Sequence, residues 1–261
     1  MCEADTRERD TLARMKKCLF CQRAVDSAEH LWSDWILKDL KPVEPIHVKI
    51  GRRTSKWVDN PEVRVKCVCQ KCNNSWMSDL ENENKPHIRT MMHGNPITLE
   101  PKQQRSLTRW AILKGMVLEA AAKKTVPFYT ESEKAEIAPP STFIPVATRA
   151  WIGRLRVGGF HAGGTDTYGD INGVPKAFHG CVTTIIVGQL VVQALTTHVL
   201  PMFGTLPFRP NYKRGAWHKN LLEVWPVFGK VRWPPPLSFT PDGGNSIGGL
   251  INRWKIGTDV G

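Results

Sequence analysis

The sequence lacks the features that would assign a protein to a membrane or to secretion. Its first ten residues, MCEADTRERD, are highly charged and contain no apolar core of the kind that a secretory signal needs. Its longest apolar run, residues 181–195, is shorter than the roughly 20 residues of a membrane helix. It has no polybasic tract and no basic amphipathic helix, which disfavours binding to a membrane surface. These absences predict a soluble, cytoplasmic protein.

Several motifs of common enzyme classes are also missing. The chain has no GxSxG sequence, with which α/β-hydrolases expose a nucleophilic serine. The glycine-rich stretch 157–173 is neither a Walker loop nor a GxGxxG turn between a strand and a helix, so we interpret it as a flexible turn. No repeat of the solenoid kind is visible. Seven histidines fall at no metal-ligand spacing and are interpreted as structural or exposed: His47, His87, His93, His161, His179, His198 and His218.

Acidic residues are scarce relative to basic ones. Lys and Arg number 36 against 24 Asp and Glu, which gives a net charge of +12. Most of the excess lies in residues 101–261, where 19 basic and 9 acidic residues give a net charge of +10. A basic excess of this size favours a polyanionic partner, and nucleic acid is the commonest candidate. Arg52, Arg53 and Lys56, in the segment GRRTSKW, are candidate phosphate contacts, with a solvated hairpin tip as the alternative.

The cysteines are arranged in a pattern typical of a metal site. There are seven, an odd number, and four of them form two CxxC pairs: Cys18, Cys21, Cys69 and Cys72. Without a secretion signal, such pairs favour metal ligation over disulfides. Two pairs supply the four thiolates that a tetrahedral structural zinc ion requires. Cys67 is a rival to Cys69, but the CxxC spacing favours Cys69, and Cys2 and Cys181 are interpreted as incidental.

The spacing of apolar residues predicts a mixed α+β protein. Residues 1–95 are expected to form a small zinc-stabilised module, and residues 96–261 a larger, basic α+β domain of unknown type. Helices are expected within 30–40, from Asn73 or Asn74 to a break at Pro86, and over 102–124. Strands and turns are expected over 41–72, and further strands over 149–160, 181–195 and 221–227.

A possible reaction centre lies between the two cysteine pairs. Glu29 and His30 are adjacent in sequence, and Asn73 directly follows the last cysteine of the second pair. A zinc ion would bring these segments together, so that Glu29 and Asn73 converge as oxygen ligands with His30 beside them. Such ligands suit Mg²⁺ or Mn²⁺, and a neutral histidine next to the ion can deprotonate water. This set of groups suits hydrolysis of a phosphodiester.

The order CLFC, AEHLWSDW and VCQKCNNSWMSDLE resembles zinc-containing HNH, or ββα-metal, endonucleases. It is similar to the branch containing the phage junction-resolving endonuclease VII, and to uncharacterised bacterial and phage HNH-like proteins. The resemblance covers about residues 16–86 and implies a treble-clef-like ββα-metal module. It implies that the paired cysteines bind zinc, that Glu29 and Asn73 hold the catalytic Mg²⁺ or Mn²⁺, and that His30 is the general base. The favoured function is metal-dependent cleavage of nucleic acid, with DNA ahead of RNA.

Two other functions stay open at this point. One is a zinc-stapled module that binds nucleic acid or protein without cutting it. Ser33 favours this alternative, because proline is usual there in the resembling proteins, and so does the lack of a clear central asparagine other than Asn60. The other is a structural or regulatory protein. Dependence on a divalent ion distinguishes the enzyme from the binder, and a salt-sensitive gel shift distinguishes the nucleic-acid binder from the structural protein.

Overall fold

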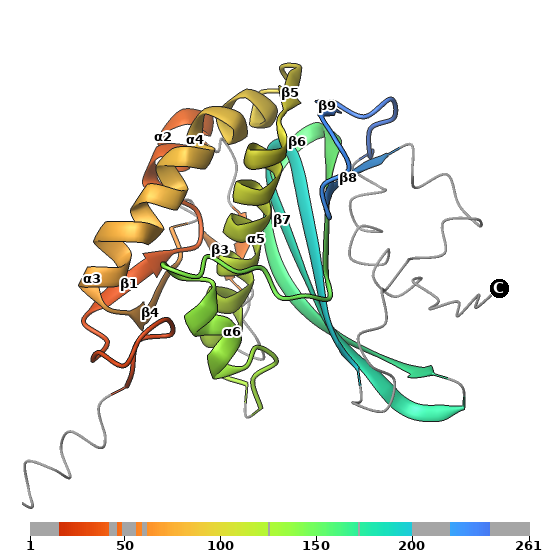
Figure 1. Ribbon diagram of the computed structural model, residues 1–261. Coiled ribbons are helices and arrows are strands. Elements are labelled where there is room, and N and C mark those ends of the chain that lie inside the picture. Colours follow the sequence, from red (N-terminus) through yellow and green to blue (C-terminus); the bar gives the residue numbers. More distant parts are fainter. Residues whose placement is uncertain are drawn as a thin grey trace, which may run out of the picture.

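A computed structural model describes residues 16–41, 46–48, 56–58, 62–124, 126–171, 173–199 and 220–240. The fold is mixed α+β, as the sequence predicts. A small antiparallel pair of strands and the helices that follow it lie on one side, and a long curved sheet lies on the other (Figure 1). The helix α5, Pro101–Ala122, stands between them and packs against both.

The N-terminal part is built around two short strands, β1 (Ser27–His30) and β4 (Arg64–Val68). They pair antiparallel, with His30 opposite Arg64 and an irregularity in register between Ser27 and Glu29. The helix expected within residues 30–40 is confirmed as α2, Asp34–Leu40. Between α2 and β4, two further strands, β2 (Ile46–Val48) and β3 (Lys56–Val58), form a separate antiparallel pair.

The helix after the second cysteine pair differs from its prediction at both ends. It begins with α3 (Gln70–Cys72), whose N-cap is Cys69, so neither Asn73 nor Asn74 starts it. A π-helical turn, η1 (Asn73–Met77), leads into α4 (Ser78–Met92). The break predicted at Pro86 is wrong, because α4 continues through this residue. Pro86 is exposed, so the carbonyl group that loses its amide partner there can be hydrated, while buried side chains of the last turn hold the helix to the core.

The predicted helix over 102–124 is confirmed as α5, which starts at Pro101 with a capping box at Glu100. Before it, β5 (Ile97–Leu99) pairs with β9 (Val231–Trp233), which ties this region to the end of the described chain. After α5 comes the short helix α6, Glu131–Glu136, also with a capping box.

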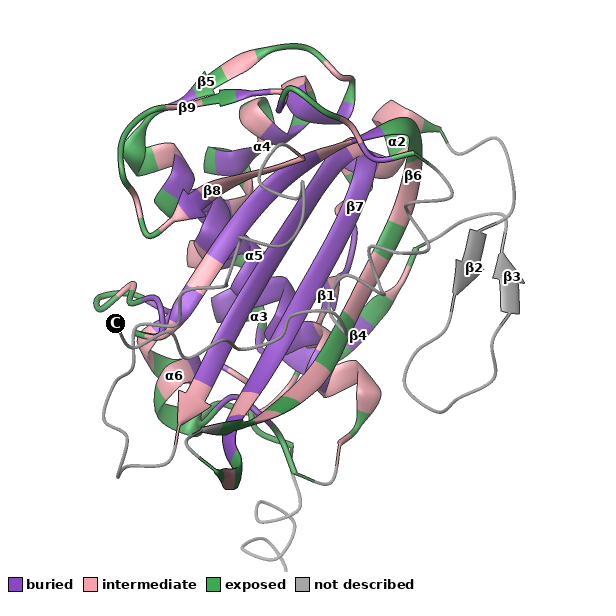
Figure 2. Cartoon of the chain, turned by 90° about the vertical axis from the view of Figure 1, so that its right-hand side faces the viewer, coloured by how far each residue is buried: buried purple, intermediate pink, exposed green. Residues whose placement is uncertain are grey.

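The long sheet consists of β6 (Thr148–Ile171), β7 (Val174–Val199) and β8 (Leu221–Trp225), in the order β7-β6-β8. The turn predicted over 157–173 is wrong: the strands continue through it and reverse only between Ile171 and Val174. The stretch also contains residues that favour strands, among them Val157, Phe160, Thr165, Thr167 and Tyr168. Figure 2 shows β7 buried along most of its length, whereas the far part of β6 is largely exposed.

One close approach explains a glycine in the most apolar strand. Gly188 of β7 has φ of +56°, and a Cβ atom there would lie 2.3 Å from the carbonyl oxygen of Met92. Only glycine combines this backbone conformation with the missing side chain. The end of α4 can therefore rest directly on β7.

A single large hydrophobic cluster connects the parts of the fold. It joins buried side chains before residue 95, such as Ile36 and Leu80, to others after it, such as Ile112 and Ile152. Because α5 packs against both β4 and β7, the two predicted domains share this core, and the boundary near residue 95 stays a prediction. Among the described residues, no helix combines the length and the apolar character needed to cross a membrane.

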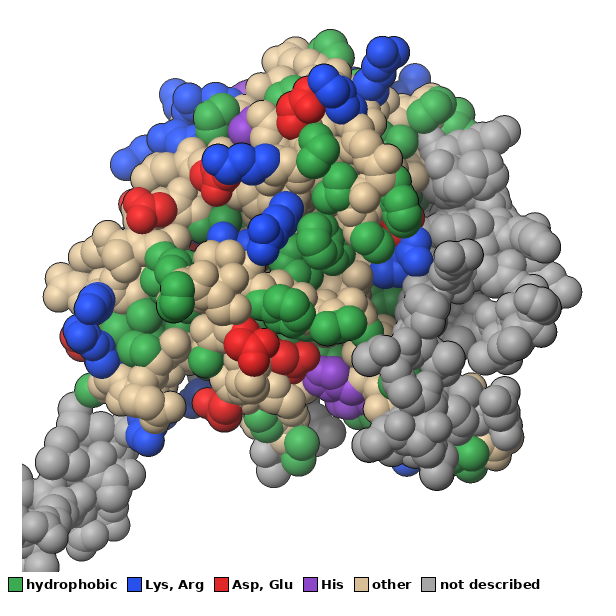
Figure 3. All heavy atoms as spheres, viewed as in Figure 1, with side chains coloured by type: hydrophobic (Ala, Val, Ile, Leu, Met, Phe, Trp, Pro, Cys, Tyr) green, Lys and Arg blue, Asp and Glu red, His purple; other side chains and the backbone are tan. Residues whose placement is uncertain are grey.

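Figure 3 shows how basic residues are distributed over one face of the molecule, which bears on the predicted binding of a polyanion. Lys and Arg side chains are spread over this face among Asp and Glu side chains and are not gathered into one patch. The basic excess in the sequence therefore does not by itself mark a docking surface on this face.

Candidate metal centre

The four paired cysteines meet at one point of the fold. Cys18 and Cys21 lie in the turn before β1, Cys69 caps α3, and Cys72 ends it. Their sulfur atoms all lie within 4.8 Å of one another, with Cys21 3.6 Å from Cys69 and 3.7 Å from Cys72. A tetrahedral zinc ion with bonds of about 2.3 Å separates its sulfur ligands by about 3.8 Å. The donor set and spacing therefore fit zinc, and these residues could coordinate it.

The chain around the four sulfurs holds them in this arrangement. The backbone N–H of Cys72 donates to Cys69 Sγ over 3.4 Å, and the backbone N–H of Gln70 donates to the carboxylate of Asp26. Phe20, in the first CxxC pair, packs edge-on against Trp76 of η1 with ring centroids 5.1 Å apart. The second pair is thus held by a hydrogen bond within its own turn, and contacts between distant segments hold the surroundings of the two pairs together.

The thiols differ in how readily they ionise. Burial raises the pKa of Cys18 and of Cys72. At Cys69 burial also acts to raise the pKa, but the N–H of Cys72 and the neighbouring thiols donate to it, outweigh burial and lower the pKa. Zinc binds thiolates, so the lowered pKa of Cys69 favours metal ligation at this sulfur.

Cys67, the rival of Cys69, is placed elsewhere. It is buried on β4 and does not belong to the four-sulfur cluster found among the described residues. Burial raises its pKa to about 12, and the charge of nearby Glu29 contributes. Cys67 is therefore an inert core thiol, and the preference for Cys69 is confirmed.

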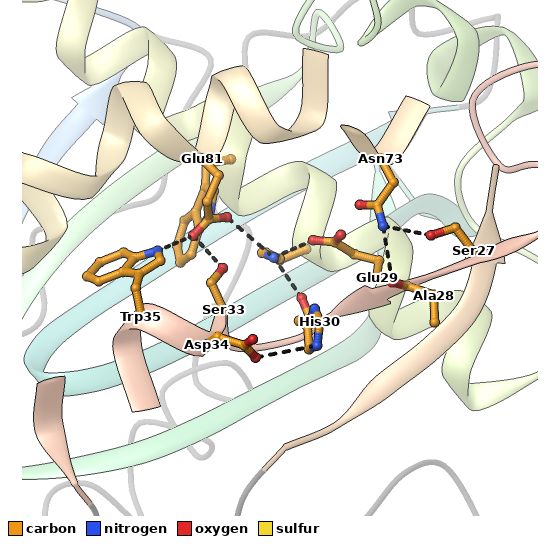
Figure 4. Close-up of polar contacts among 11 residues, drawn as sticks. Ser27, Ala28, Glu29, His30, Ser33, Asp34, Trp35, Asn73 and Glu81 are labelled. Carbon is orange, nitrogen blue, oxygen red and sulfur yellow. Dashed lines mark hydrogen bonds and ion pairs between the residues drawn. The ribbon is translucent and has the colours of Figure 1, made fainter. Parts of the chain in front are cut away.

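The two predicted catalytic residues of β1 lie on opposite faces of this strand. Glu29 is buried and its side chain extends into the core, whereas His30 points outward toward Asp34 at the start of α2 (Figure 4). Successive residues of a strand alternate between its faces, so adjacency in sequence separates these side chains in space. The inner and the outer face of β1 must be considered separately.

On the inner face, Glu29 is paired with a lysine. Lys114 of α5 donates from Nζ to Glu29 Oε1 over 2.6 Å and to the backbone oxygen of His30 over 2.7 Å. The same ammonium group lies 3.6 Å from Glu81 Oε2 of α4, and only 1% of the lysine side chain is exposed. Burial alone would lower the pKa of Lys114, but the two carboxylates outweigh it and raise that pKa. The inner face thus already holds a cation.

Glu81 completes this buried cluster. Its carboxylate accepts hydrogen bonds from the hydroxyl group of Ser33 and from the indole N–H groups of Trp35 and Trp110. Burial acts to raise the pKa of Glu81, but Lys114 and these donors outweigh it and lower the pKa. Ser33, which stands where the resembling proteins usually have proline, therefore connects α2 to α4 through its hydrogen bond to Glu81.

Asn73 lies beside β1 but is engaged with the backbone. Its amide nitrogen donates to Ser27 Oγ over 2.9 Å and to the carbonyl oxygen of Ala28 over 3.2 Å (Figure 4). The structure thus brings Asn73 next to the strand that carries Glu29, as expected. Among the described residues, however, Glu29 belongs to no cluster of three or more His, Cys, Asp or Glu donors, and a metal ion there would have to share it with Lys114. The Glu29–Asn73 metal site stays a prediction.

On the outer face, three donors converge. His30 Nε2 lies 3.5 Å from Asp34 Oδ1 and 3.4 Å from Glu62 Oε1, and the three donor atoms all lie within 4.8 Å of one another. This nitrogen is shielded from solvent and has no hydrogen-bond partner within the part of the chain that the structure describes. Glu62 is in turn paired with Arg64 on β4. This set could hold a metal ion.

The predicted phosphate contacts cannot be placed as side chains. Arg52 and Arg53, like Asn60, lie outside the described residues. Lys56 is the first residue of β3, and only its backbone is described. The alternative interpretation of this segment, a hairpin tip, is compatible with the antiparallel pairing of β2 and β3.

Sequence reasoning missed four residues of these clusters: Lys114, Glu81, Asp34 and Glu62. Lys114 gave a signal, because a lysine interrupts the apolar stripe of the most regular helix in the sequence. A buried lysine needs a carboxylate partner, and a buried glutamate was available at position 29. Asp34 and Glu62 gave no such signal, because no spacing in the sequence relates Glu62 to His30 or to Asp34.

Comparison with known proteins does not extend this description, since no family model, no curated protein and no solved structure matches this chain.

Proposed function

We propose that this protein hydrolyses phosphodiester bonds in nucleic acid with the help of a divalent metal ion, and that the reaction takes place on the outer face of β1. The observation that carries the proposal is the position of His30. Its Nε2 atom faces two carboxylates at the edge of a zinc-compatible module, 3.4 and 3.5 Å away. A nitrogen base and ligands for a cation are thus available together on this face.

Zinc has a structural part in this proposal. Cys18, Cys21, Cys69 and Cys72 would hold it, and four thiolate ligands leave no open position for a substrate. Its chemical contribution is to fix the two cysteine turns to each other. The ion that assists hydrolysis must then bind elsewhere, at oxygen and nitrogen donors.

Hydrolysis would form a bond from a water oxygen to phosphorus and break the bond from phosphorus to the 3′ oxygen. The water gives up a proton, and the departing oxygen gains one. His30 Nε2 could accept this proton when it is not bound to the cation; when it is bound, the carboxylates of Asp34 and Glu62 are the groups on this face that could accept it. Lys114 acts from the inner face of the strand. It donates a hydrogen bond to the carbonyl oxygen of His30 and so fixes the backbone that carries the imidazole.

The charge of the chain supports a polyanionic substrate. Residues 101–261 contribute a net charge of +10, and the net charge of the chain is +12. Attraction to a phosphate backbone is independent of base sequence and weakens steeply with salt. We propose DNA as the first substrate to test, with RNA second.

A second candidate function follows from the inner face. Because Glu29 is already neutralised by Lys114, the metal site implied by the resemblance has one of its ligands occupied. A zinc-stapled module that binds nucleic acid without cutting it would need no such site. This binding module is therefore the alternative.

Purified protein loaded with zinc should be incubated with supercoiled, linear and branched DNA, with and without Mg²⁺ or Mn²⁺. Omission of the ion is a better control than EDTA, because EDTA would also remove zinc. We expect cleavage that needs the divalent ion and is lost in His30→Ala. His87→Ala, a histidine substitution elsewhere on the same part of the fold, should cleave like wild type. DNA binding without cleavage under every condition would instead support the binding module.

A further inference from the structure

We infer that His30, Asp34 and Glu62 form a binding site for one divalent cation, and that His30 is a metal ligand in it. The three residues come from three segments. His30 is the last residue of β1, Asp34 is the first residue of α2, and Glu62 lies just before β4. The turn between β1 and α2 and the pairing of β1 with β4 bring them together.

The distances fit metal ligands better than ion pairs. A charge-assisted N–H···O bond between an imidazolium and a carboxylate has a length of about 2.7–2.9 Å. His30 Nε2 lies 3.5 Å from Asp34 Oδ1 and 3.4 Å from Glu62 Oε1. Ligands about 2.1 Å from a tetrahedral ion are about 3.4 Å apart. Both distances from His30 Nε2 thus match the separation of two ligands on one metal ion, and the carboxylate donors of Asp34 and Glu62 lie within 4.8 Å of each other.

The chemistry of the donors indicates which ions would bind. One neutral imidazole and two carboxylates balance the charge of a divalent ion. An imidazole among carboxylates suits Mn²⁺ or Zn²⁺ better than Mg²⁺, which prefers oxygen ligands alone. Three protein ligands leave at least one position for water or for a phosphate oxygen, which is the arrangement of a catalytic site rather than of a structural one.

Neighbouring residues hold the ligands in place. The guanidinium group of Arg64, directly opposite His30 in the strand pair, binds Glu62 Oε1. Both Nε and Nη2 of Arg64 contact this oxygen, so a metal ion would have to share Glu62 with the guanidinium group. The start of α2 is anchored by the hydrogen bond from Ser33 to Glu81. Such supporting contacts fix the orientation of ligands and commonly govern the affinity of a metal site.

A second histidine–carboxylate pair provides a contrast. His93 Nε2 lies 3.4 Å from Asp39 Oδ1, and Arg89 is paired with the same carboxylate. This group has only one carboxylate, and it is not among the three-donor clusters of the described residues. Asp39, on the same helix as Asp34, is therefore a matched control position.

Only the role of this site in hydrolysis depends on the proposed function. Binding of the cation can be measured without any substrate. The full chain, loaded with one equivalent of zinc, should be titrated with Mn²⁺ alone and followed by the electron paramagnetic resonance signal of free Mn²⁺. We expect one Mn²⁺ per chain beyond the zinc. His30→Ala, Asp34→Asn and Glu62→Gln should each weaken its binding by at least about ten-fold, whereas Asp39→Asn should leave it unchanged.

The outcomes separate the two proposals. No stoichiometric Mn²⁺ in the wild type, or unchanged affinity in His30→Ala, would overturn the metal site. Unchanged affinity together with loss of cleavage in His30→Ala would leave the nuclease proposal standing, with His30 as a base and not as a ligand. Mn²⁺ binding that needs all three residues, without cleavage of any nucleic acid, would support the site and count against the nuclease. Zinc content and circular dichroism of each variant establish that it is folded.

Discussion

The adjacent residues Glu29 and His30 lie in opposite environments on the two faces of strand β1. On the inner face, the carboxylate of Glu29 is bound by the ammonium group of Lys114, whose side chain is only 1% exposed. On the outer face, the side chain of His30 is 26% exposed and faces two carboxylates at distances longer than a hydrogen bond. A charge that is buried must be paired, since an isolated one would cost several kcal/mol. A donor at the surface can remain available for a ligand.

The two faces of β1 therefore have different roles. The inner cluster of Glu29, Glu81 and Lys114 links β1, α4 and α5 and so contributes to the geometry of the fold. The outer cluster of His30, Asp34 and Glu62 contributes little to the core, and Asp34 is the most exposed of its three side chains. Variants that change the zinc centre, the inner face or the outer face separately test this division.

Removing the zinc centre should disrupt both faces at once. Cys72→Ser takes away one of four ligands, and structural zinc contributes about 10 kcal/mol or more in small zinc domains. We expect zinc content to fall from one per chain toward zero, with loss of cooperative unfolding of residues around β1. Metal analysis and urea unfolding measure this. Cys67→Ala is the control and should retain its zinc, and a zinc-loaded, stable Cys72→Ser protein would contradict the assignment.

Breaking the inner face alone should cost stability and leave zinc in place. Lys114→Met leaves two buried carboxylates without their cation, and removal of one partner from a buried ion pair costs about 3–5 kcal/mol. The free energy of unfolding in urea should fall by this amount, and adding Glu29→Gln should recover part of it. Lys102→Met changes an exposed lysine with a weak ion pair and should stay within about 0.5 kcal/mol of wild type. Equal effects of the two lysine substitutions would disprove the buried cluster.

The inner face should also respond to acid. The pKa of Glu81 is lowered in the folded protein, so the unfolded chain binds a proton at this residue at higher pH than the folded chain does. Its contribution to stability is present above the unfolded pKa of about 4.3 and is lost as the pH falls through the folded value.

The measurement is urea unfolding of wild type and Glu81→Gln at several pH values from about 7 downward through about 4. The difference in unfolding free energy between the two proteins should shrink toward acid. Because the cysteine thiolates are common to both, their own acid sensitivity cancels in this difference. A difference that does not depend on pH would show that Glu81 is not held ionised by Lys114.

Breaking the outer face should have the smallest effect on stability. Asp34 is about half exposed, so Asp34→Asn should change the free energy of unfolding by no more than about 0.5 kcal/mol, although it removes a proposed metal ligand. Urea unfolding without added Mn²⁺ tests this. A loss comparable to that of Lys114→Met would mean that the outer residues are part of the core, and the distinction between the two faces would fail.

The zinc-compatible centre could be predicted from sequence because its information is local. Each CxxC pair spans one tight turn, so its two sulfurs face one point wherever the rest of the chain goes. The regular apolar spacing of residues 102–124 predicted α5 for the same reason. Both predictions depend on contacts within a few residues of each other.

The inner cluster could not be predicted because its partners are far apart in the chain. Glu29 meets Lys114 only after α5 has packed against β4, and no spacing rule relates them. Pro86 and the glycines of 157–173 were misjudged because local preference was taken as decisive, whereas packing against the core and pairing with β7 outweigh it. The outer cluster depends equally on tertiary structure, because pairing of β1 with β4 is what brings Glu62 to His30.

The decisive experiment compares cleavage of supercoiled DNA in Mn²⁺ by zinc-loaded His30→Ala and Glu29→Gln, at a temperature at which both variants are folded. If the reaction takes place on the outer face of β1, His30→Ala should lose cleavage and Glu29→Gln should retain it. Loss of cleavage in Glu29→Gln, with His30→Ala cutting like wild type, would contradict this account and place the reaction on the inner face.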